Sequence, residues 1–336
     1  MMTHELKKIV EAGEKALGKG KKAVLATVVA LDGSSYRRPG VRMLLLEDGT
    51  MVGAVSGGCV EKEVFRQSLF VFETQISKVM TYDGRYRLGC EGVLYILLEP
   101  FQPTPHVISN FWDTIAQRKP FGICSYFQKE HGENEGYGSV LRVGDTSFPF
   151  HESYTIALEL ELFEQDLSPC FQLVIIGTEH DAVQMCAMAA LMGWEVTIVA
   201  NPREEKTQMD FPGATHFVNV EPESFVMESD NQTAILLMTH SYVKDLQFLM
   251  GLREHQPAYF GVLGPARRRE KLFNELLEKR PDTSLEFIES VYGPAGLELG
   301  AETPQEIALS VLSEIVASIN QKKPASLREK VGRIHS

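Results

Sequence analysis

The sequence predicts an α/β fold in which an N-terminal α+β domain precedes a C-terminal Rossmann-like domain with a doubly wound parallel sheet. In the second half of the chain, short apolar runs alternate with helical stretches, as in repeated strand–helix units. In the first half, strand-like runs dominate and a few helices interrupt them. The polar segment 165–169 separates the halves, so we predict domains at residues 1–165 and 166–336.

The N-terminal domain is predicted to begin with a helix over residues 5–17, which ends at Gly18-Lys19-Gly20. Asp48-Gly49 indicates a hairpin turn. Apolar residues at helical spacing from Val60 to Phe72 predict a second helix. We predict the strands of this domain at residues 23–30, 41–46, 51–55, 76–82, 93–98, 121–127, 140–143 and 154–162.

The C-terminal domain is predicted to contain parallel strands, because its apolar runs are continuous rather than alternating. Thr303 is typical of a helix N-cap, with Pro304 at the first helical position and Glu306 completing a capping box. We predict strands at residues 173–177, 195–199, 234–238, 258–262 and 285–288, and helices at 182–189, 242–253, 267–279 and 303–319.

Composition and charge exclude several classes of protein. The net charge of −12 and the pI near 5.3 argue against a duplex nucleic-acid partner, which needs a basic surface. The N-terminal residues do not form a secretory signal, and no apolar run reaches membrane-spanning length. The five cysteines include no Cys-x-x-Cys pair, which argues against a zinc knuckle or a disulfide framework. We therefore expect a cytoplasmic protein without a membrane anchor.

A basic, glycine-bounded loop and a cysteine motif form the first candidate site. The loop spans residues 33–40, and the motif is Ser56-Gly57-Gly58-Cys59 at the start of a helix. The hairpin brings both to one end of the sheet, and a helix N-terminus near arginines lowers the pKa of a thiol. A small buried packing role for Cys59 is the alternative. The candidate ligand-binding residues here are Arg37, Arg38, Ser56, Gly57, Gly58 and Cys59, and Cys59 is also the candidate metal ligand.

The expected dinucleotide fingerprint is altered. The turn after the first C-terminal strand reads Gly177-Thr178-Glu179-His180-Asp181-Ala182, so a glutamate replaces the second glycine. Asn201 stands where the ribose-binding acid is expected, and we therefore do not expect ordinary NAD(P) binding. His180 is either a ligand-binding or a capping residue. The remaining candidates at the carboxyl ends of these strands are Gly177, His180, His240, Gly264 and Arg267.

These motifs, taken together and in order, resemble the XdhC/CoxI family, the accessory factors of xanthine dehydrogenase and related molybdenum hydroxylases. The N-terminal resemblance rests on residues 33–43 and 56–61, and the C-terminal one on several separated segments. Leu88-Gly89-Cys90-Glu91-Gly92 resembles the family's second cysteine–glycine element, which makes Cys90 a further candidate. Glu91 departs from the family's usual glycine. The C-terminal segments are 177–182, 211–212, 239–240, 261–264 and 293–306.

The resemblance implies a non-catalytic or weakly catalytic factor that binds molybdenum cofactor, supports its sulfuration and inserts it into a hydroxylase such as xanthine dehydrogenase. It also implies a cysteine desulfurase as partner. The form of the cofactor, molybdopterin or its dinucleotide, stays open, as does a homodimer. The first alternative is a nucleotide-dependent oxidoreductase that uses the Rossmann domain. The second is a scaffold that bridges desulfurase and hydroxylase without holding cofactor.

Overall fold

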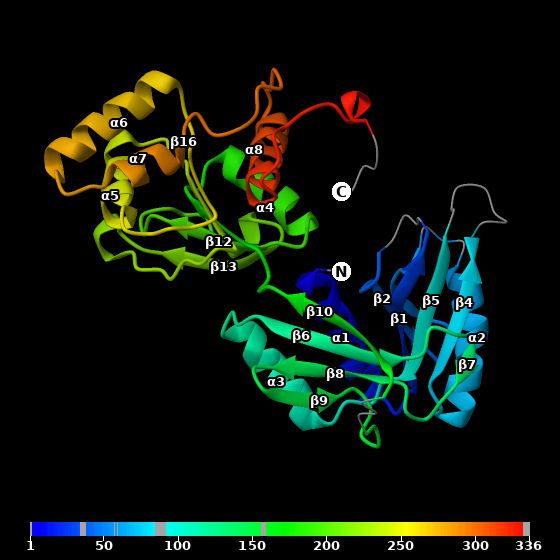
Figure 1. The fold of residues 1–336 in the computed structure, drawn as a ribbon. Helices are drawn as coiled ribbons and strands as arrows, with labels where there is room; N and C mark the ends of the chain where they lie inside the picture. The colour runs from blue at the N-terminus through cyan, green and yellow to red at the C-terminus, as the bar shows by residue number, and fades with distance from the viewer. Residues whose placement is uncertain are drawn as a thin grey trace. The chain divides into compact units, whose positions relative to one another are not determined.

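The computed structural model describes residues 2–33, 38–56, 58, 60–84, 92–155 and 159–331. The chain forms two compact units, Met1–Cys170 and Phe171–Ser336 (Figure 1). The predicted boundary after residue 165 falls inside β10 (Glu161–Leu167). Pairing of β10 with β6 (Phe121–Phe127) holds these residues in the first unit.

The first unit contains two antiparallel sheets. The larger has the strand order β3-β2-β1-β5-β4-β7, and the smaller has the order β10-β6-β8-β9. The predicted hairpin is present: β2 pairs with β3, and Gly49 in its turn has a φ of 88°, which favours glycine. The bounds are β1 Ala23–Asp32, β2 Arg42–Leu46, β3 Met51–Gly53, β4 Lys78–Asp83, β5 Val93–Pro100, β7 Gly132–Glu133, β8 Gly138–Val143 and β9 Thr146–Pro149.

Alternation along β1 divides the core of the first unit between two faces of the larger sheet. Val24 and Ala26 belong to the cluster that α2 (Glu61–Thr74) covers. Leu25 belongs to the cluster formed with α1 (Thr3–Leu17) and α3 (Pro105–Ala116). α3 was not predicted from the sequence, although Thr104 caps it by accepting a hydrogen bond from Val107 N and proline follows at its start.

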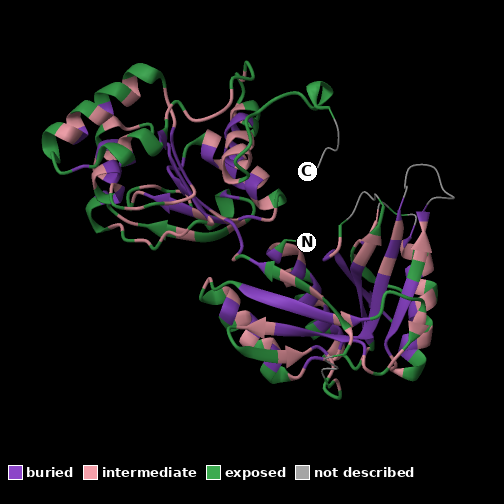
Figure 2. Ribbon diagram, in the orientation of Figure 1, coloured by how far each residue is buried: buried purple, intermediate pink, exposed green. Residues whose placement is uncertain are grey.

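Buried residues run along the central strands of both sheets of this unit (Figure 2), and a few of them are polar. Arg42 is fully buried, and burial lowers its pKa to about 10 against the opposing effect of Glu99. Glu99 accepts hydrogen bonds from Ser139 N and Ser139 Oγ, both at 2.6 Å. Ser139 Oγ also lies 2.7 Å from Ser125 Oγ, so these bonds link β5 of one sheet to β8 and β6 of the other.

The second unit is a single six-stranded parallel sheet with the order β13-β12-β11-β14-β15-β16. The first strand in the chain, β11, lies near the centre with strands added outward on both sides, which is the doubly wound order. The predicted fold class is confirmed. The bounds are β11 Gln172–Ile176, β12 Glu195–Ala200, β13 Ala214–Asn219, β14 Thr233–Leu237, β15 Tyr259–Val262 and β16 Val291–Tyr292.

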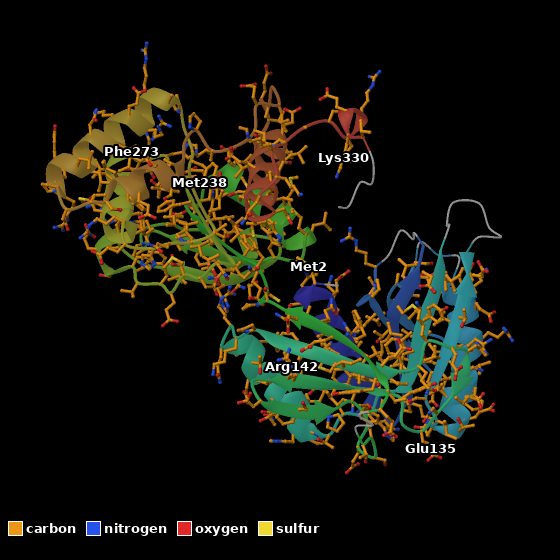
Figure 3. The ribbon with its side chains drawn as sticks, in the orientation of Figure 1. Met2, Glu135, Arg142, Met238, Phe273 and Lys330 are labelled. Atoms are coloured by element: carbon orange, nitrogen blue, oxygen red, sulfur yellow. The ribbon has the colours of Figure 1, made fainter. Side chains whose placement is uncertain are left out.

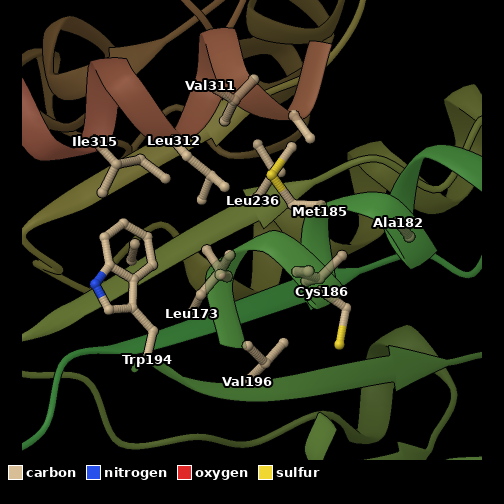
Figure 4. Packing of buried hydrophobic residues seen from close by; sticks show 14 of the residues in the cluster. Leu173, Ala182, Met185, Cys186, Trp194, Val196, Leu236, Val311, Leu312 and Ile315 are labelled. Atoms are coloured by element: carbon tan, nitrogen blue, oxygen red, sulfur yellow. The ribbon is translucent and has the colours of Figure 1, made fainter. Parts of the chain in front are cut away.

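Helices cover both faces of this sheet. On one face α4 (His180–Leu191) and α8 (Pro304–Ile319) pack together over the strands. Figure 4 shows Met185 of α4 and Leu312 of α8 meeting above Leu236 of β14. On the other face lie α5 (Tyr242–Leu252), α6 (Ala266–Lys279) and α7 (Leu285–Ser290). Helices therefore shield both faces of the sheet from water, as the continuous apolar runs of its strands predict.

Two predicted strands are placed differently by the structure. The strand predicted at 285–288 is wrong, because Ser284 caps a helix there by accepting a hydrogen bond from Phe287 N. Leu285 is 70% exposed whereas Phe287 is buried, so only one face of this short helix packs on the core. The strand predicted at 154–162 begins only at Glu161, and residues 156–158 lie outside the described residues. The edge strands β13 and β16 were not predicted.

Glu99 generates a testable pH dependence. Burial raises its pKa from 4.5 to about 7, although bonds from Ser139 and the charge of Arg42 oppose the rise. Between these values the folded chain binds more protons than the unfolded chain, so the free energy of unfolding falls as pH rises through this window. Glu99→Gln should remove this fall, measured by urea unfolding from pH 4.5 to above pH 7. The exposed Glu135→Gln variant is the control, and equal pH profiles for wild type and Glu99→Gln would contradict the assignment.

Candidate functional site

Four predicted ligand-binding residues of the first unit lie outside the described residues: Arg37, Gly57, Cys59 and Cys90. Their roles stay predictions. The residues that flank them are described, and these show how the two motifs are held. Arg38 is exposed, and Ser56 and Gly58 frame the start of α2.

Ser56 and Glu61 hold the start of α2 by reciprocal hydrogen bonds. Ser56 N and Ser56 Oγ donate to the two carboxylate oxygens of Glu61, each at 2.7 Å. Ser56 Oγ in turn accepts from Gly58 N at 3.1 Å and from Val60 N at 3.2 Å. The exchange is similar in kind to a capping box, in which side chains satisfy the backbone donors at a helix start.

The carboxylate of Glu61 lies at the positive end of α2. Burial raises its pKa, but hydrogen bonds from the Ser56 hydroxyl and from the backbone of Glu61, Ser56 and Val60 outweigh burial, so the net shift is downward. Free backbone N–H groups at a helix start can bind an anionic ligand. In the described part of the motif, Ser56 and Glu61 already accept hydrogen bonds from them.

Arg42 anchors the end of the basic loop. Its NH1 donates to Gly40 O at 3.0 Å and to Gln165 Oε1 of β10. Gly40 has a φ of 94°, and a Cβ there would lie 2.7 Å from the Gln165 side chain. The glycine that ends the loop is therefore required by local geometry, and Arg42 serves as a buried anchor rather than as a surface cation.

In the second unit, Gly177 ends β11 where the chain turns into α4. Its φ is 138°, and a Cβ would lie 2.4 Å from Met238 O at the end of β14. Any side chain is excluded at this position. Glu179 is the N-cap residue without a side-chain cap bond, and His180 is the first residue of α4; both are exposed. His180 therefore does not cap the helix through its side chain.

A lysine that the sequence analysis missed lies at this turn. Lys206 Nζ donates to Thr178 O, and Lys206 comes from the segment after β12. The ammonium brings a positive charge next to the turn that carries Glu179. The nearby Asn201 donates to Glu221 Oε2 at 3.0 Å and accepts from Arg203 N at 3.1 Å. Its side chain holds the local loop together.

His240 lies across from α4, at the end of β14. It has a φ of 56°, and its Nε2 is 3.8 Å from Asp181 Oδ2. The loop that carries it is fixed by Asp245, which is 1% exposed and accepts hydrogen bonds from Thr239 N at 3.1 Å and Thr239 Oγ1 at 2.5 Å. Asp245 holds the position of His240 without contacting it.

Asp245 also pairs with an arginine of the next loop. Arg268 NH2 donates to Asp245 Oδ2 at 2.6 Å, and its guanidinium lies 5.8 Å from the centre of the Tyr242 ring. Gly264 precedes this helix with a φ of 122°, and a Cβ there would lie 2.9 Å from Arg268 Cδ. Arg267, by contrast, is exposed. Of the two arginines, Arg268 builds the loop and Arg267 is available to a ligand.

Hydrogen bonds to Glu314 of α8 hold the glycine-rich loop that precedes this helix. The capping box of Thr303 and Glu306 is present as predicted. Glu314 accepts hydrogen bonds from Tyr259 Oη at 2.6 Å and from Gly296 N at 2.8 Å. Burial, followed by the bond to Glu314, raises the pKa of Tyr259. The loop is thereby tied to both β15 and α8.

The structure brings four sequence-predicted residues to one edge of the parallel sheet. Gly177, His180, His240 and Gly264 lie at the carboxyl ends of β11, β14 and β15, which are neighbours in the sheet. Among the described residues, no three His, Cys, Asp or Glu side chains form a metal-binding group. No helix in the described ranges is both long and apolar enough to cross a membrane.

These features define the class: the second unit is a Rossmann domain in which the turn after β11 carries an altered fingerprint, and an antiparallel two-sheet unit precedes it. Comparison with family models identifies residues 173–315 as an XdhC Rossmann domain and residues 16–83 as part of the XdhC and CoxI family. The chain belongs to the XdhC and CoxI family, which confirms the resemblance.

Individual relatives resemble the chain over nearly its whole length. It is 28% identical to a Bacillus subtilis protein named as a probable subunit of xanthine dehydrogenase, over 88% of this chain and 93% of that protein. It is 26% identical to the molybdenum cofactor insertion chaperone PaoD of Escherichia coli, over 94% and 89%. A crystal structure of a xanthine dehydrogenase from Bacillus halodurans matches with a TM-score of 0.76 and 26% identity, over 95% of this chain and 98% of that one.

The Asp245 pair yields a stability prediction. Asp245→Asn removes the negative charge opposite Arg268 in a buried site, and breaking such a pair is costly. We expect the free energy of unfolding to fall by about 2 kcal/mol. Urea unfolding is the measurement, with the exposed Arg267→Ala as control, which should change it by less than about 0.5 kcal/mol. Equal effects of the two variants would refute the anchoring role of Asp245.

Proposed function

We propose that this protein is an accessory factor that binds molybdenum cofactor, supports its terminal sulfuration and inserts it into xanthine dehydrogenase or a related molybdenum hydroxylase. The names of two relatives support the general role, since one is a molybdenum cofactor insertion chaperone and the other a probable part of xanthine dehydrogenase. The cargo is handled in the cytoplasm and is passed on rather than consumed.

The observation that carries the proposal is the ligand edge of the Rossmann sheet. Gly177 and Gly264 leave no room for a Cβ because Met238 O and the Arg268 side chain lie against them, so these glycines set the turns that form this edge. The ammonium of Lys206 adds positive charge beside Thr178 O. A cofactor with a phosphate tail suits such an edge, and the exposed Arg267 extends the positive charge along it.

Sulfuration is assigned to the first unit. Cys59 is the candidate group, and a cysteine desulfurase is the proposed sulfur donor. The Ser56–Glu61 exchange holds Gly58 and Val60, the two described residues that flank Cys59 in the sequence. The described cysteines are poor substitutes for such a role, because Cys124, Cys170 and Cys186 are buried.

The competing oxidoreductase function is less well supported. A nicotinamide dinucleotide would meet the carboxylate of Glu179 at the turn and would find Asn201 bonded to Glu221 instead of a ribose-binding acid. The scaffold alternative predicts no cofactor binding at all. These three functions therefore differ in the ligand that the purified protein retains.

The central test is to purify the protein from a molybdenum-replete host and to identify co-purifying pterin by oxidation and fluorescence. Retention of pterin, and tight binding of isolated molybdopterin, supports the accessory role. Protein that carries no pterin and does not bind added molybdopterin fits the scaffold and refutes our proposal.

Cys59→Ser tests the sulfur chemistry. Serine keeps the approximate size of the side chain but loses the thiolate, so we expect loss of hydroxylase activity in a strain that depends on this protein. Cys124→Ser is the matched control, because burial raises the pKa of this thiol and leaves it unreactive. Wild-type hydroxylase activity with Cys59→Ser would overturn the assignment of Cys59.

Calorimetric titration with NADH tests the altered fingerprint. We expect a dissociation constant of about 100 µM or weaker. If the Glu179 carboxylate repels the pyrophosphate, Glu179→Gly should tighten binding, whereas the exposed Glu205→Gly should not. Submicromolar binding of NADH to the wild-type protein would favour the oxidoreductase.

A further inference from the structure

The strand β13 is the outermost strand on one side of the parallel sheet in the second unit. It pairs with β12 on its inner side, and no strand of the described residues lies beyond it. Met238, labelled in Figure 3, lies at the end of β14 in the middle of the same sheet. An edge strand presents a row of backbone N–H and C=O groups that can pair with another strand. The proposed cofactor chemistry uses no residue of β13.

The backbone groups of Phe217 and Asn219 point away from β12. Val220 N donates to Ala200 O of β12 at 3.0 Å, so the backbone of Val220 faces inward. Successive residues of a strand direct their backbone groups to opposite sides, so Val218 also faces inward, whereas Phe217 and Asn219 face outward. Within the described part of the chain, no other element donates to or accepts from these outward groups.

The start of the same edge is covered by the chain itself. Gln208 Nε2 donates to Ala214 O at 2.9 Å and to Thr215 O at 3.4 Å. The register of β13 against β12 also shifts at this point. The open part of the edge is therefore residues 216–219.

The open edge lacks the residues that usually prevent strand pairing. β13 contains no Lys, Arg, Asp, Glu or Pro, whereas natural edge strands often carry charged side chains or proline. Exposed apolar side chains lie near its start. Met209, which adjoins Gln208, is 94% exposed. Leu191 is 88% exposed and follows Ala190, whose Cβ would lie 2.4 Å from a Cβ at Gly213.

The register around Val218 allows β13 to pair with its own copy. A two-fold axis beside Val218 places Phe217 of each chain opposite Asn219 of the other. Both residues can then exchange N–H and C=O groups across the interface, because both face outward. Val218, which is 38% exposed, lies opposite Val218 of the second copy, so an apolar pair forms at the axis.

The charge of the edge also favours a second copy over a basic partner. The chain has a net charge of −12, so two copies repel each other where their acidic surfaces meet. β13 contributes no carboxylate to this repulsion, and it offers none to attract a basic strand. An identical, uncharged strand therefore fits this edge.

We propose that two copies of this protein associate through β13, in antiparallel register about Val218, so that the two Rossmann sheets form one continuous sheet. A two-fold axis makes such a contact closed, with the same surface used by both copies. The contact runs along β13, whereas the ligand edge lies at the carboxyl ends of β11, β14 and β15. The association is independent of the proposed cofactor function.

Sedimentation velocity of the full chain, from about 1 to about 100 µM, measures the association. We expect the wild type to dimerise in this range. Val218→Lys and Val218→Glu each place two like charges opposite each other, so the dissociation constant of the dimer should rise by about tenfold. Val226→Lys is the matched control, because Val226 is exposed and lies outside β13, and it should leave the dissociation constant unchanged.

A mixture of Val218→Lys and Val218→Glu tests the register. Opposite charges then face each other at the axis, so the mixed dimer should form at least about fivefold more tightly than either variant alone. A general defect in folding of the variants would not be repaired by mixing them. Circular dichroism and thermal unfolding verify that each variant is folded.

Val218→Cys is a conservative second variant. Facing residues of this kind have Cα atoms about 4.5 Å apart, which a disulfide can span. Oxidised glutathione should give a cross-linked dimer of Val218→Cys that neither the wild type nor Val226→Cys gives. The proposal is overturned if the wild type stays monomeric at about 100 µM, if Val218→Lys dimerises like Val226→Lys, if the mixture associates no more tightly than its components, or if Val218→Cys does not cross-link.

Discussion

The second unit depends on one close approach, between Gly177 and the carbonyl of Met238. A Cβ at Gly177 would lie 2.4 Å from Met238 O, so the two backbones can approach this closely only because residue 177 has no side chain. β11 and β14 are neighbours, and the contact sets the turns that lead to α4 and α5 side by side. His240 thereby reaches Asp181, and the ligand edge forms at the point where the strand order reverses.

The buried strands of both units were predictable from the sequence because buried strands consist largely of apolar residues. β11 and β14 are continuous apolar runs, and β1 is buried over most of its length. β13 escaped prediction because it is an edge strand whose residues are mostly exposed or half-buried. Residues 285–288 were predicted wrongly, since an apolar run was weighted above the capping serine before it. Local capping signals decided the outcome there, as they also did at α3.

Residues of the candidate site were predictable where the type of one residue at a motif position is sufficient to identify it. Gly177 and Gly264 were found from motif position, and their contacts explain why glycine is needed. Lys206 and Asp245 were not found, because each acts on a partner that lies elsewhere in the chain: Thr178, 28 residues away, and Arg268, 23 residues away. Such pairings have no periodicity or spacing in the sequence. They become visible only when neighbouring strand ends are assembled.

The hydrogen bonds between Ser56 and Glu61 bear on the proposed binding of cofactor by the first unit. The backbone donors of Gly58 and Val60 are satisfied, and a resident carboxylate balances the positive end of α2 before anything binds. Because these hydrogen bonds are made within the chain, loss of a bound ligand leaves no backbone donor of Gly58 or Val60 unpaired. If cofactor binds here as we propose, it gains no hydrogen bond from Gly58 N or Val60 N, and this favours its release.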